Sequence, residues 1–317
     1  MLEYPALGYT TAPHYFFTCS DEVLEAAAMY IPQEAMVYLV VHQTPTREMV
    51  RDLAERMGVT ISDERYGIMP EFAPRGGEYS ATVGVMSPDS LGDLDVTLSD
   101  DGNYMLNLRS EQPGSNDPDA PTDERAVAVA EDFVKRSGLL PKGSRFERVG
   151  LGEAVTENLP GGGDRQKPLG TMVIYTRDLG GIPDGSFAIR INGREQVYSV
   201  SRNALNLTPF RAYPLLTPAE AVEALRVGDG SLSGPWAPPG LWEAVVDSID
   251  LRYNSGAPGW EMGTIQPVFS ISGITPRSRD RWSAMVPAVR REYLKRLDLG
   301  HGGGGHAGGG AGPRAPR

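Results

Sequence analysis

Cysteine, histidine and long apolar runs are scarce in this chain of 317 residues. One Cys and four His are too few for an internal disulfide or a structural zinc cluster. No window of about 18 consecutive apolar residues occurs, which predicts no direct insertion into a membrane. Positive charge is also in deficit, because 30 Lys and Arg stand against 41 Asp and Glu. A net charge of −11 predicts that nucleic acid and anionic lipid are not the partners.

The motifs of nucleophilic catalysis are missing as well. A nucleophile elbow needs Gly-x-Ser-x-Gly, and the serines of residues 230–234 do not occupy its centre. Cys19 would have to pair with His14 or His42, yet no electropositive setting that activates a thiol surrounds it. The sequence therefore predicts no catalytic, cofactor-binding or metal-binding residue, and a protein that is not an enzyme.

Two carboxylate pairs leave one alternative open, a hydrolase with an acidic loop site. Asp93 and Asp95 share a strand face because strand side chains alternate with period two. Asp100 and Asp101 lie in a turn, where solvated acids are common. Neither pair belongs to a calcium-loop pattern. Two carboxylates that face one cleft, one of them desolvated, would favour the enzyme.

Glycine and proline are plentiful, with 38 and 26 residues, and they gather in four stretches. Residues 110–121 are polar and acidic, which predicts a linker between domains. Residues 158–169 are typical of a surface hairpin tip, and residues 231–241 form a Pro-rich loop. The last 17 residues consist only of Gly, Ala, Pro, His and Arg, which predicts a disordered tail.

Helix signals recur three times between these loops. Each helix begins at a threonine suited to capping and ends at a glycine. The caps are Thr44, Thr122 and Thr217, and the terminating glycines are Gly58, Gly138 and Gly228. A shorter helix is expected from Ser20 to Tyr30, before Pro32.

Strand-like runs follow each helix. They cover residues 36–42, 79–86, 94–98, 104–108, 145–149, 171–176, 186–191, 195–200, 247–254, 263–272 and 282–289. Asn192-Gly193 predicts a two-residue hairpin turn with positive φ at both positions. A helix followed by antiparallel strands, repeated along the chain, predicts an α+β fold of two to three tandem units, each a helix packed on an antiparallel β-sheet. The expected limits are 1–110, 121–212 and 213–298, with the Gly-rich tail at 299–317.

Tryptophan marks a candidate contact surface. Trp236 and Trp242 flank the Pro-rich residues 235–240, and Trp and Pro together make rigid recognition surfaces. The same placement would arise if the loop were pinned to its sheet by its own aromatic side chains. Together with exposed sheet edges, which can accept an added strand, these two residues are the predicted partner-binding site, and the partner is a protein or peptide.

Three stretches carry a family resemblance. They are Ala126, Ala130 and Phe133 followed by Gly138–Pro141; Tyr175–Gly185 followed by Asn192-Gly193; and Thr217–Val222 with Leu225, then Ile249–Tyr253 and Ile265–Phe269 ending at Gly273. Over about residues 120–290 the chain resembles the extracytoplasmic YycH/YycI-type regulatory proteins of Gram-positive bacteria and, more broadly, PepSY-type modules.

The resemblance implies an accessory protein outside the membrane that modulates a sensor histidine kinase through protein contacts, with no catalytic residues to carry over. Such proteins are held by an N-terminal transmembrane helix, so an anchor would precede Met1; if Met1 is the natural start, a cytoplasmic location is expected. PepSY-type modules also imply a peptidase-inhibitory role. This chain departs from the family by lacking the anchor helix and by carrying the Gly-rich tail. Neither the partner's identity nor the oligomeric state follows from the sequence.

Overall fold

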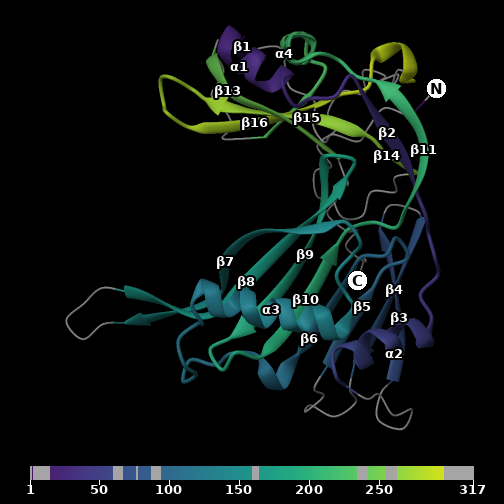
Figure 1. Cartoon of the computed structure of the whole chain (residues 1–317), viewed down its shortest axis with the longest axis vertical. Coiled ribbons are helices and arrows are strands. Elements are labelled where there is room, and N and C mark those ends of the chain that lie inside the picture. Colours follow the sequence, from purple (N-terminus) through teal and green to yellow (C-terminus); the bar gives the residue numbers. More distant parts are fainter. Residues whose placement is uncertain are drawn as a thin grey trace, which may run out of the picture.

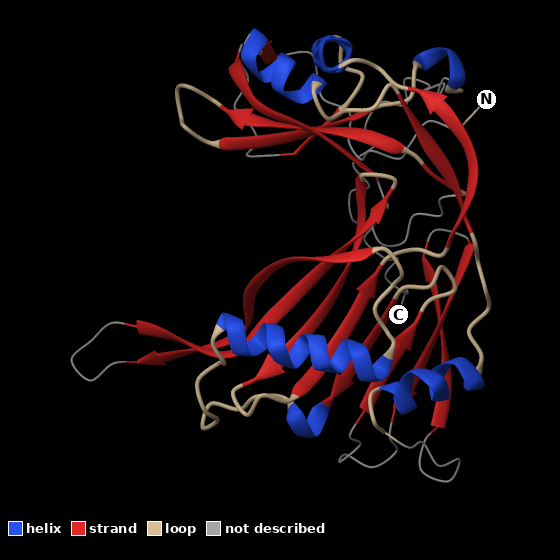
Figure 2. Cartoon of the chain, in the orientation of Figure 1, coloured by secondary structure: helices blue, strands red, loops and turns tan. Residues whose placement is uncertain are grey.

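The fold is α+β, in agreement with the sequence pattern (Figures 1 and 2). The computed structural model describes residues 2, 15–59, 67–75, 78–86, 94–158, 164–233, 242–253 and 263–295. Within them the helices are α1 (Asp21–Ala28), α2 (Arg47–Arg56), α3 (Asp123–Ser137) and α4 (Pro218–Arg226). None of these described helices is long and apolar enough to cross a membrane.

The strands form three sheets. Their bounds are β1 (Tyr15–Thr18), β2 (Glu34–Val40), β3 (Gly67–Arg75), β4 (Glu78–Met86), β5 (Leu94–Leu98), β6 (Tyr104–Leu108), β7 (Ser144–Asn158), β8 (Asp164–Leu179), β9 (Ile182–Asn192), β10 (Val197–Asn203), β11 (Leu207–Pro214), β12 (Ser231–Ser233), β13 (Trp242–Tyr253), β14 (Thr264–Ile265), β15 (Pro267–Ile274) and β16 (Arg281–Pro287).

The capping residues set where the helices begin. The Thr217 side chain and Glu220 form the expected capping box at α4, and the hydroxyl of Thr122 accepts a hydrogen bond from the Arg125 backbone N–H at α3. The start of α2 is two residues later than expected. Its cap is Thr46 rather than Thr44, because the Thr46 hydroxyl accepts the hydrogen bond from the Met49 backbone N–H at 3.3 Å.

The lower arm of Figure 1 is an eight-stranded antiparallel sheet in the order β3-β4-β5-β6-β10-β9-β8-β7. Both α2 and α3 lie on one face of it (Figure 2). Their apolar sides meet the sheet in a core that includes the fully buried Val50, Leu106, Phe187 and Ile189. The alternation of buried and half-exposed residues along β5 is what period-two patterning predicts for a sheet covered on one face.

The upper arm is a five-stranded sheet in the order β1-β13-β15-β16-β12, covered by α1 and α4. Its strands are antiparallel except that β1 runs parallel to β13. Phe17 and Trp282 pack edge to face with ring centroids 5.2 Å apart, and Phe269 is fully buried in the same core. Burial of these aromatic rings holds the N-terminal strand against the C-terminal sheet.

A three-stranded sheet, in the order β11-β2-β14, joins the two arms on one side. The strand β2 leads into the lower arm and β11 leads out of it, and the two pair antiparallel. The lower arm is therefore an insertion between two adjacent strands. The division at residues 110 and 213 stays a prediction, but the hydrogen-bonded sheets cross these limits, because β1 and β2 pair with strands beyond residue 206.

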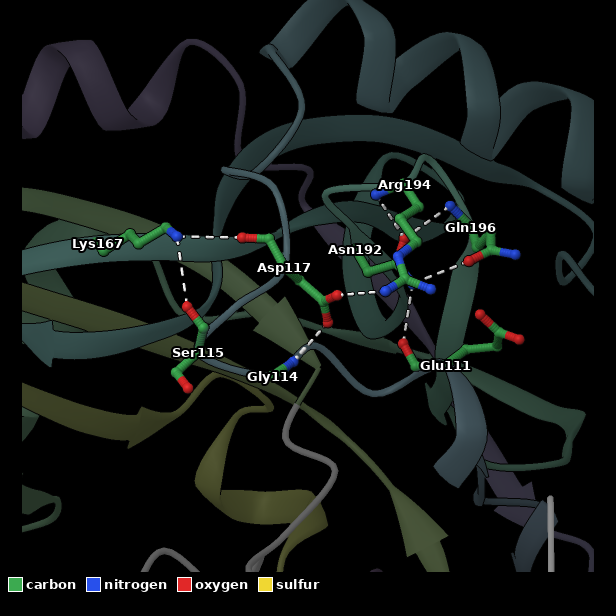
Figure 3. A network of polar contacts seen from close by, with 8 residues as sticks. All are labelled: Glu111, Gly114, Ser115, Asp117, Lys167, Asn192, Arg194 and Gln196. Atoms are coloured by element: carbon green, nitrogen blue, oxygen red, sulfur yellow. Dashed lines mark hydrogen bonds and ion pairs between the residues drawn. The ribbon is translucent and has the colours of Figure 1, made fainter.

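Residues 110–121, expected as a linker, are fastened to the end of the lower sheet (Figure 3). The Asp117 carboxylate accepts hydrogen bonds from the Gly114 backbone N–H at 2.7 Å and from Arg194 at 2.6 Å. Lys167 donates to the Asp117 carbonyl at 3.1 Å. The hydrogen bond from Gly114 holds the pKa of Asp117 below its usual value, and Arg194 acts in the same direction. We call this segment the strap.

The turn between β9 and β10 also differs from the expected two-residue form. The left-handed residue is Glu195, with φ of 61°, and neither Asn192 nor Gly193 has a positive φ. The Asn192 side chain closes the turn by accepting the Gln196 backbone N–H at 3.0 Å. Glycine is needed at position 193 for another reason, since a Cβ there would lie 2.1 Å from the Pro118 carbonyl oxygen of the strap.

Candidate functional site

A cleft with a volume of about 800 Å³ lies where the two arms approach each other. Its floor is the hairpin between β8 and β9, and its walls are the start of β7, the end of β13 and the residues that follow α1. The lining residues are Tyr30–Pro32, Arg145–Glu147, Thr176, Gly180–Ser186 and Ile249–Tyr253. Four segments far apart in the sequence thus surround one space, and we refer to it as the cleft.

Glycines shape the floor of the cleft. Gly180 and Gly181 form the tight turn with φ of 70° and 90°, values that favour glycine. The Asp178 carboxylate accepts the Gly181 backbone N–H at 2.6 Å and fixes that turn. Gly185, with φ of 59°, allows the carbonyl oxygen of Asn203 to lie 2.5 Å from where a Cβ would stand. The stretch Tyr175–Gly185, which carries part of the family resemblance, is therefore the cleft floor.

Exposed aromatic rings stand on both walls. Tyr30, at the end of α1, is 69% exposed, and Phe146, on β7, is 49% exposed. Phe146 is held in place by an edge-to-face contact with Tyr175, with ring centroids 6.2 Å apart. Large apolar side chains left in water inside a concave surface are a common mark of a contact site.

A buried ion pair lies under the floor. Arg177 of β8 and Asp184 of β9 have side chains that are 10% and 0% exposed, and the Arg177 Nε donates to Asp184 Oδ2 at 2.8 Å. A second guanidinium nitrogen of Arg177 donates to the Leu205 carbonyl at 2.9 Å, on the segment that leads from β10 to β11. The other carboxylate oxygen, Oδ1, has no hydrogen-bond partner among the described residues. This pair ties the cleft floor to the junction of the arms.

Burial dominates the electrostatics at this junction. It raises the pKa of the Asp184 carboxyl, and the adjacent Arg177 opposes that rise. Burial likewise raises the pKa of the Tyr253 phenol, which donates to the Met36 carbonyl at 2.7 Å and packs against Tyr38. These shifts follow from desolvation of the charged form. The junction is thus a desolvated region in which three sheets contribute polar side chains.

The charges that line the cleft balance one another. The lining contains Arg145 and Arg252 and the exposed carboxylates Glu147 and Asp250, and its third carboxyl, Asp184, is paired with Arg177 beneath the floor. Glu147 accepts a hydrogen bond from Thr176 and lies 3.7 Å from the Arg148 guanidinium beside it. The cleft is thus close to neutral on a chain whose net charge is −11.

The acids singled out from the sequence do not gather at the cleft. Asp95 accepts the Arg109 Nε at 2.7 Å on β5, and Asp100 lies 3.2 Å from the His42 ring nitrogen. Asp101 accepts the backbone and side-chain N–H groups of Asn103, each at 3.0 Å, and so builds its own turn. Asp93 lies outside the described residues.

Cys19 packs against the upper core, and burial raises the pKa of its thiol, the direction opposite to nucleophile activation. His14 lies outside the described residues, and His42 is on the junction between the arms. In the ranges that the structure describes, no group of three or more His, Cys, Asp and Glu side chains could hold a metal ion.

The two predicted partner-binding tryptophans cannot be placed as a pair. Trp236 lies outside the described residues, and Trp242 begins β13 with a side chain that is likewise outside them. Their role stays a prediction. Tyr30, Phe146, Arg177 and Asp184 were missed from the sequence. The one available signal was a pair of charged residues, of opposite sign, on either side of a glycine turn between apolar strand runs.

Comparison with known proteins leaves the chain without an assigned family. No protein-family model matches it, and no curated protein matches it. Among solved structures, an uncharacterized protein from Eubacterium rectale ATCC 33656 is similar with a TM-score of 0.43 and 12% identity, over 81% of this chain and 85% of that one. The Bacillus megaterium YpeB C-terminal domain is similar with a TM-score of 0.36 and 9% identity, over 78% and 94%.

Proposed function

We propose that this chain is a non-catalytic regulatory protein that binds a segment of a partner protein in the cleft between its two arms. The observation that carries the proposal is the pair of exposed aromatic side chains, Tyr30 and Phe146, on opposing walls of one space of about 800 Å³. A volume of this size is typical of ligand pockets, and aromatic anchors dominate the energetics of protein contacts.

The charge distribution supports a polypeptide as the occupant. A chain of net charge −11 repels polyanions, whereas its cleft is lined by two Arg side chains and three carboxyls, one of which, Asp184, is paired with Arg177. The YycH/YycI-type resemblance adds the partner class, a sensor histidine kinase, and an extracytoplasmic location. The PepSY-type resemblance adds a peptidase as the competing partner.

The test is selection of binders by the full chain from a phage library of random peptides. We expect peptides with aromatic or aliphatic residues to be enriched. Replacing Tyr30 and Phe146 together by Ala should weaken the selected peptides by more than about tenfold, since an anchor of this kind contributes at least about 1.4 kcal/mol. Phe210→Ala is the matched control, because Phe210 is a 52% exposed aromatic on β11 outside the cleft.

The same experiment decides between the cleft and the Pro-rich loop. If Trp236→Ala with Trp242→Ala abolishes binding while the Tyr30 and Phe146 variants bind normally, the contact lies at the tryptophans, and the cleft proposal is wrong. A library that yields no binder at all contradicts the binding function itself.

A hydrolase is the second candidate, because one desolvated carboxyl, Asp184, and two exposed ones, Glu147 and Asp250, line the same cleft. The ion pair with Arg177 gives Asp184 a structural role that explains its burial equally well. Screening of ester, glycoside and peptide substrates should show no turnover. A reproducible turnover that disappears in Asp184→Asn or Glu147→Gln would favour the enzyme.

A further inference from the structure

We infer that the bound segment is an extended strand that adds to the outer edge of β7, at the mouth of the cleft. This inference rests on the proposed function and specifies how the partner is held. The occupant to which it commits is a partner polypeptide in β conformation, bound through its own backbone, with an aromatic or aliphatic side chain against Phe146.

The first observation is the position of β7 in its sheet. It is the last strand of the eight, and within the described residues its backbone pairs on one side only, with β8. A strand edge of this kind carries backbone N–H and C=O groups that can pair with another chain. At about 3.3 Å per residue, the part from Ser144 to Leu151 offers an edge of roughly 26 Å.

The second observation is that β7 pairs regularly with β8 over most of the stretch from Ser144 to Leu151. Arg148 to Leu151 pair with β8 residue by residue, and so do Ser144 to Phe146, with one irregularity at Glu147 between them. Two further irregularities fall beyond Leu151, in the part of β7 that leads away to the hairpin tip. Because bulges blunt a strand edge, the part of β7 beyond Leu151 is the least suited to pairing, and the longest regular part, Arg148–Leu151, directly follows the cleft-lining residues Arg145–Glu147.

The third observation is that the side chains along this edge are left in water. Phe146 and Leu151 are 49% and 57% exposed, although both are large and apolar. Arg145 and Arg148 are 64% and 65% exposed and present no net charge to an incoming strand, since Asp178 lies 4.0 Å from Arg145 and Glu147 lies 3.7 Å from Arg148. A neutral edge with apolar side chains suits an uncharged or weakly charged extended segment.

The opposite wall of the cleft, formed by β13, also has a strand edge that is unpaired over part of its length. β13 pairs with β1 only from Trp242 to Val245, whereas its pairing with β15 runs from Val245 to Tyr253. In the described residues, no strand therefore pairs with its other edge beyond Val245, and Ile249–Tyr253 line the cleft. A strand on the β7 edge would therefore have side chains of Ile249–Tyr253 on the other wall of the cleft, while its backbone hydrogen bonds are made to β7 alone.

Backbone methylation tests the inference. Two peptides of about ten residues, chosen from those that the phage library yields, are resynthesised with N-methyl groups on alternate residues, in both registers. If the peptide adds to β7, one register should lose about tenfold or more in affinity, because two or more backbone hydrogen bonds are lost, and the other should bind as before. Hydrogen exchange on the full chain should show residues 144–151 protected by the unmodified peptide.

Binding that is equally sensitive or insensitive to methylation in both registers, or protection confined to β13, would overturn strand addition while leaving the cleft-binding function intact. The Phe146→Ala variant supplies a second measure: its affinity should fall for both peptides, whereas Phe210→Ala should bind them normally. A dimer of the chain that the peptides dissociate would show that a second copy is the occupant, and it would contradict the inference.

Discussion

Replacing Asp184 by Ala removes the carboxylate from the ion pair under the cleft and leaves the Arg177 guanidinium buried. Arg177 is 10% exposed and retains one described hydrogen bond, to the Leu205 carbonyl at 2.9 Å. Removing one partner of a buried pair costs about 3–5 kcal/mol, because the remaining charge is left uncompensated in a medium of low dielectric. We therefore expect the free energy of unfolding to fall by about that amount.

The matched comparison is Glu195→Ala, which breaks a similar Arg–carboxylate pair on the surface. Arg125 Nε donates to Glu195 Oε1 at 3.0 Å, but the two side chains are 59% and 40% exposed. Solvent screens such a pair, so its loss should leave the unfolding midpoint nearly unchanged. Urea denaturation followed by circular dichroism measures both variants. Equal shifts in the two midpoints would falsify the argument that burial decides the effect.

The reciprocal change, Arg177→Met, should enlarge the dependence of stability on pH that the Asp184 carboxyl confers. Burial then raises the pKa of Asp184 without opposition from Arg177. Because the folded-state pKa lies above the unfolded value of 3.8, the variant is relatively most stable below that pH and loses stability as the pH rises through the raised folded-state pKa. A tenfold change in the acid dissociation constant on folding corresponds to about 1.4 kcal/mol of stability. Urea midpoints between about pH 3.5 and 7, determined for the variant and for the unchanged chain, measure this change of stability with pH. If the midpoints of the two proteins change with pH in parallel, the reasoning is contradicted.

Two further changes test local structure. Thr217→Ala removes the side-chain oxygen that accepts the Glu220 backbone N–H at 3.2 Å, and it should cost about 1 kcal/mol; an unchanged urea midpoint would show that the cap does not stabilise α4. Gly193→Ala places a Cβ 2.1 Å from the Pro118 carbonyl and should cost about 1–3 kcal/mol while displacing the strap. A Glu-specific protease should then cut faster at Glu111, and an unaltered rate would contradict the role of Gly193.

Sequence signals within a few residues were sufficient to predict the positions of most helices and of many strands. The caps Thr122 and Thr217 and the turn between β5 and β6 lie where the sequence predicted them, because a capping hydroxyl and a turn aspartate act on backbone groups within three residues. The α2 helix shows the limit of this reasoning. Thr44 and Thr46 have the same chemistry, so the residue type alone does not tell which of them caps the helix, and in the structure it is Thr46.

The residues of the candidate site could not be predicted from such local sequence signals. The sequence pointed to Trp236, Trp242 and two pairs of acids, whereas the cleft is lined by residues from β7, β8, β9 and β13 and by those that follow α1. Phe146 does not differ in sequence from an ordinary strand residue, and the only signal for Asp184 is its charge, opposite to that of Arg177 across the glycine turn. The structure distinguishes them because the Phe146 side chain is exposed and the Asp184 side chain is buried. Both properties depend on which strands lie next to each other in the sheet.

The sequence by itself determined the α+β class, the caps Thr122 and Thr217 and the alternation of the strands, because these depend on contacts between residues close together in the chain. Only the tertiary structure decided that the lower sheet is inserted between β2 and β11, that the strap is fastened to the sheet through Asp117, and that β7 is an edge facing the cleft. These features arise from hydrogen bonds and burial between segments separated by many tens of residues. Such pairings depend on how whole sheets pack, so they cannot be predicted from a pattern of residues close together in the chain.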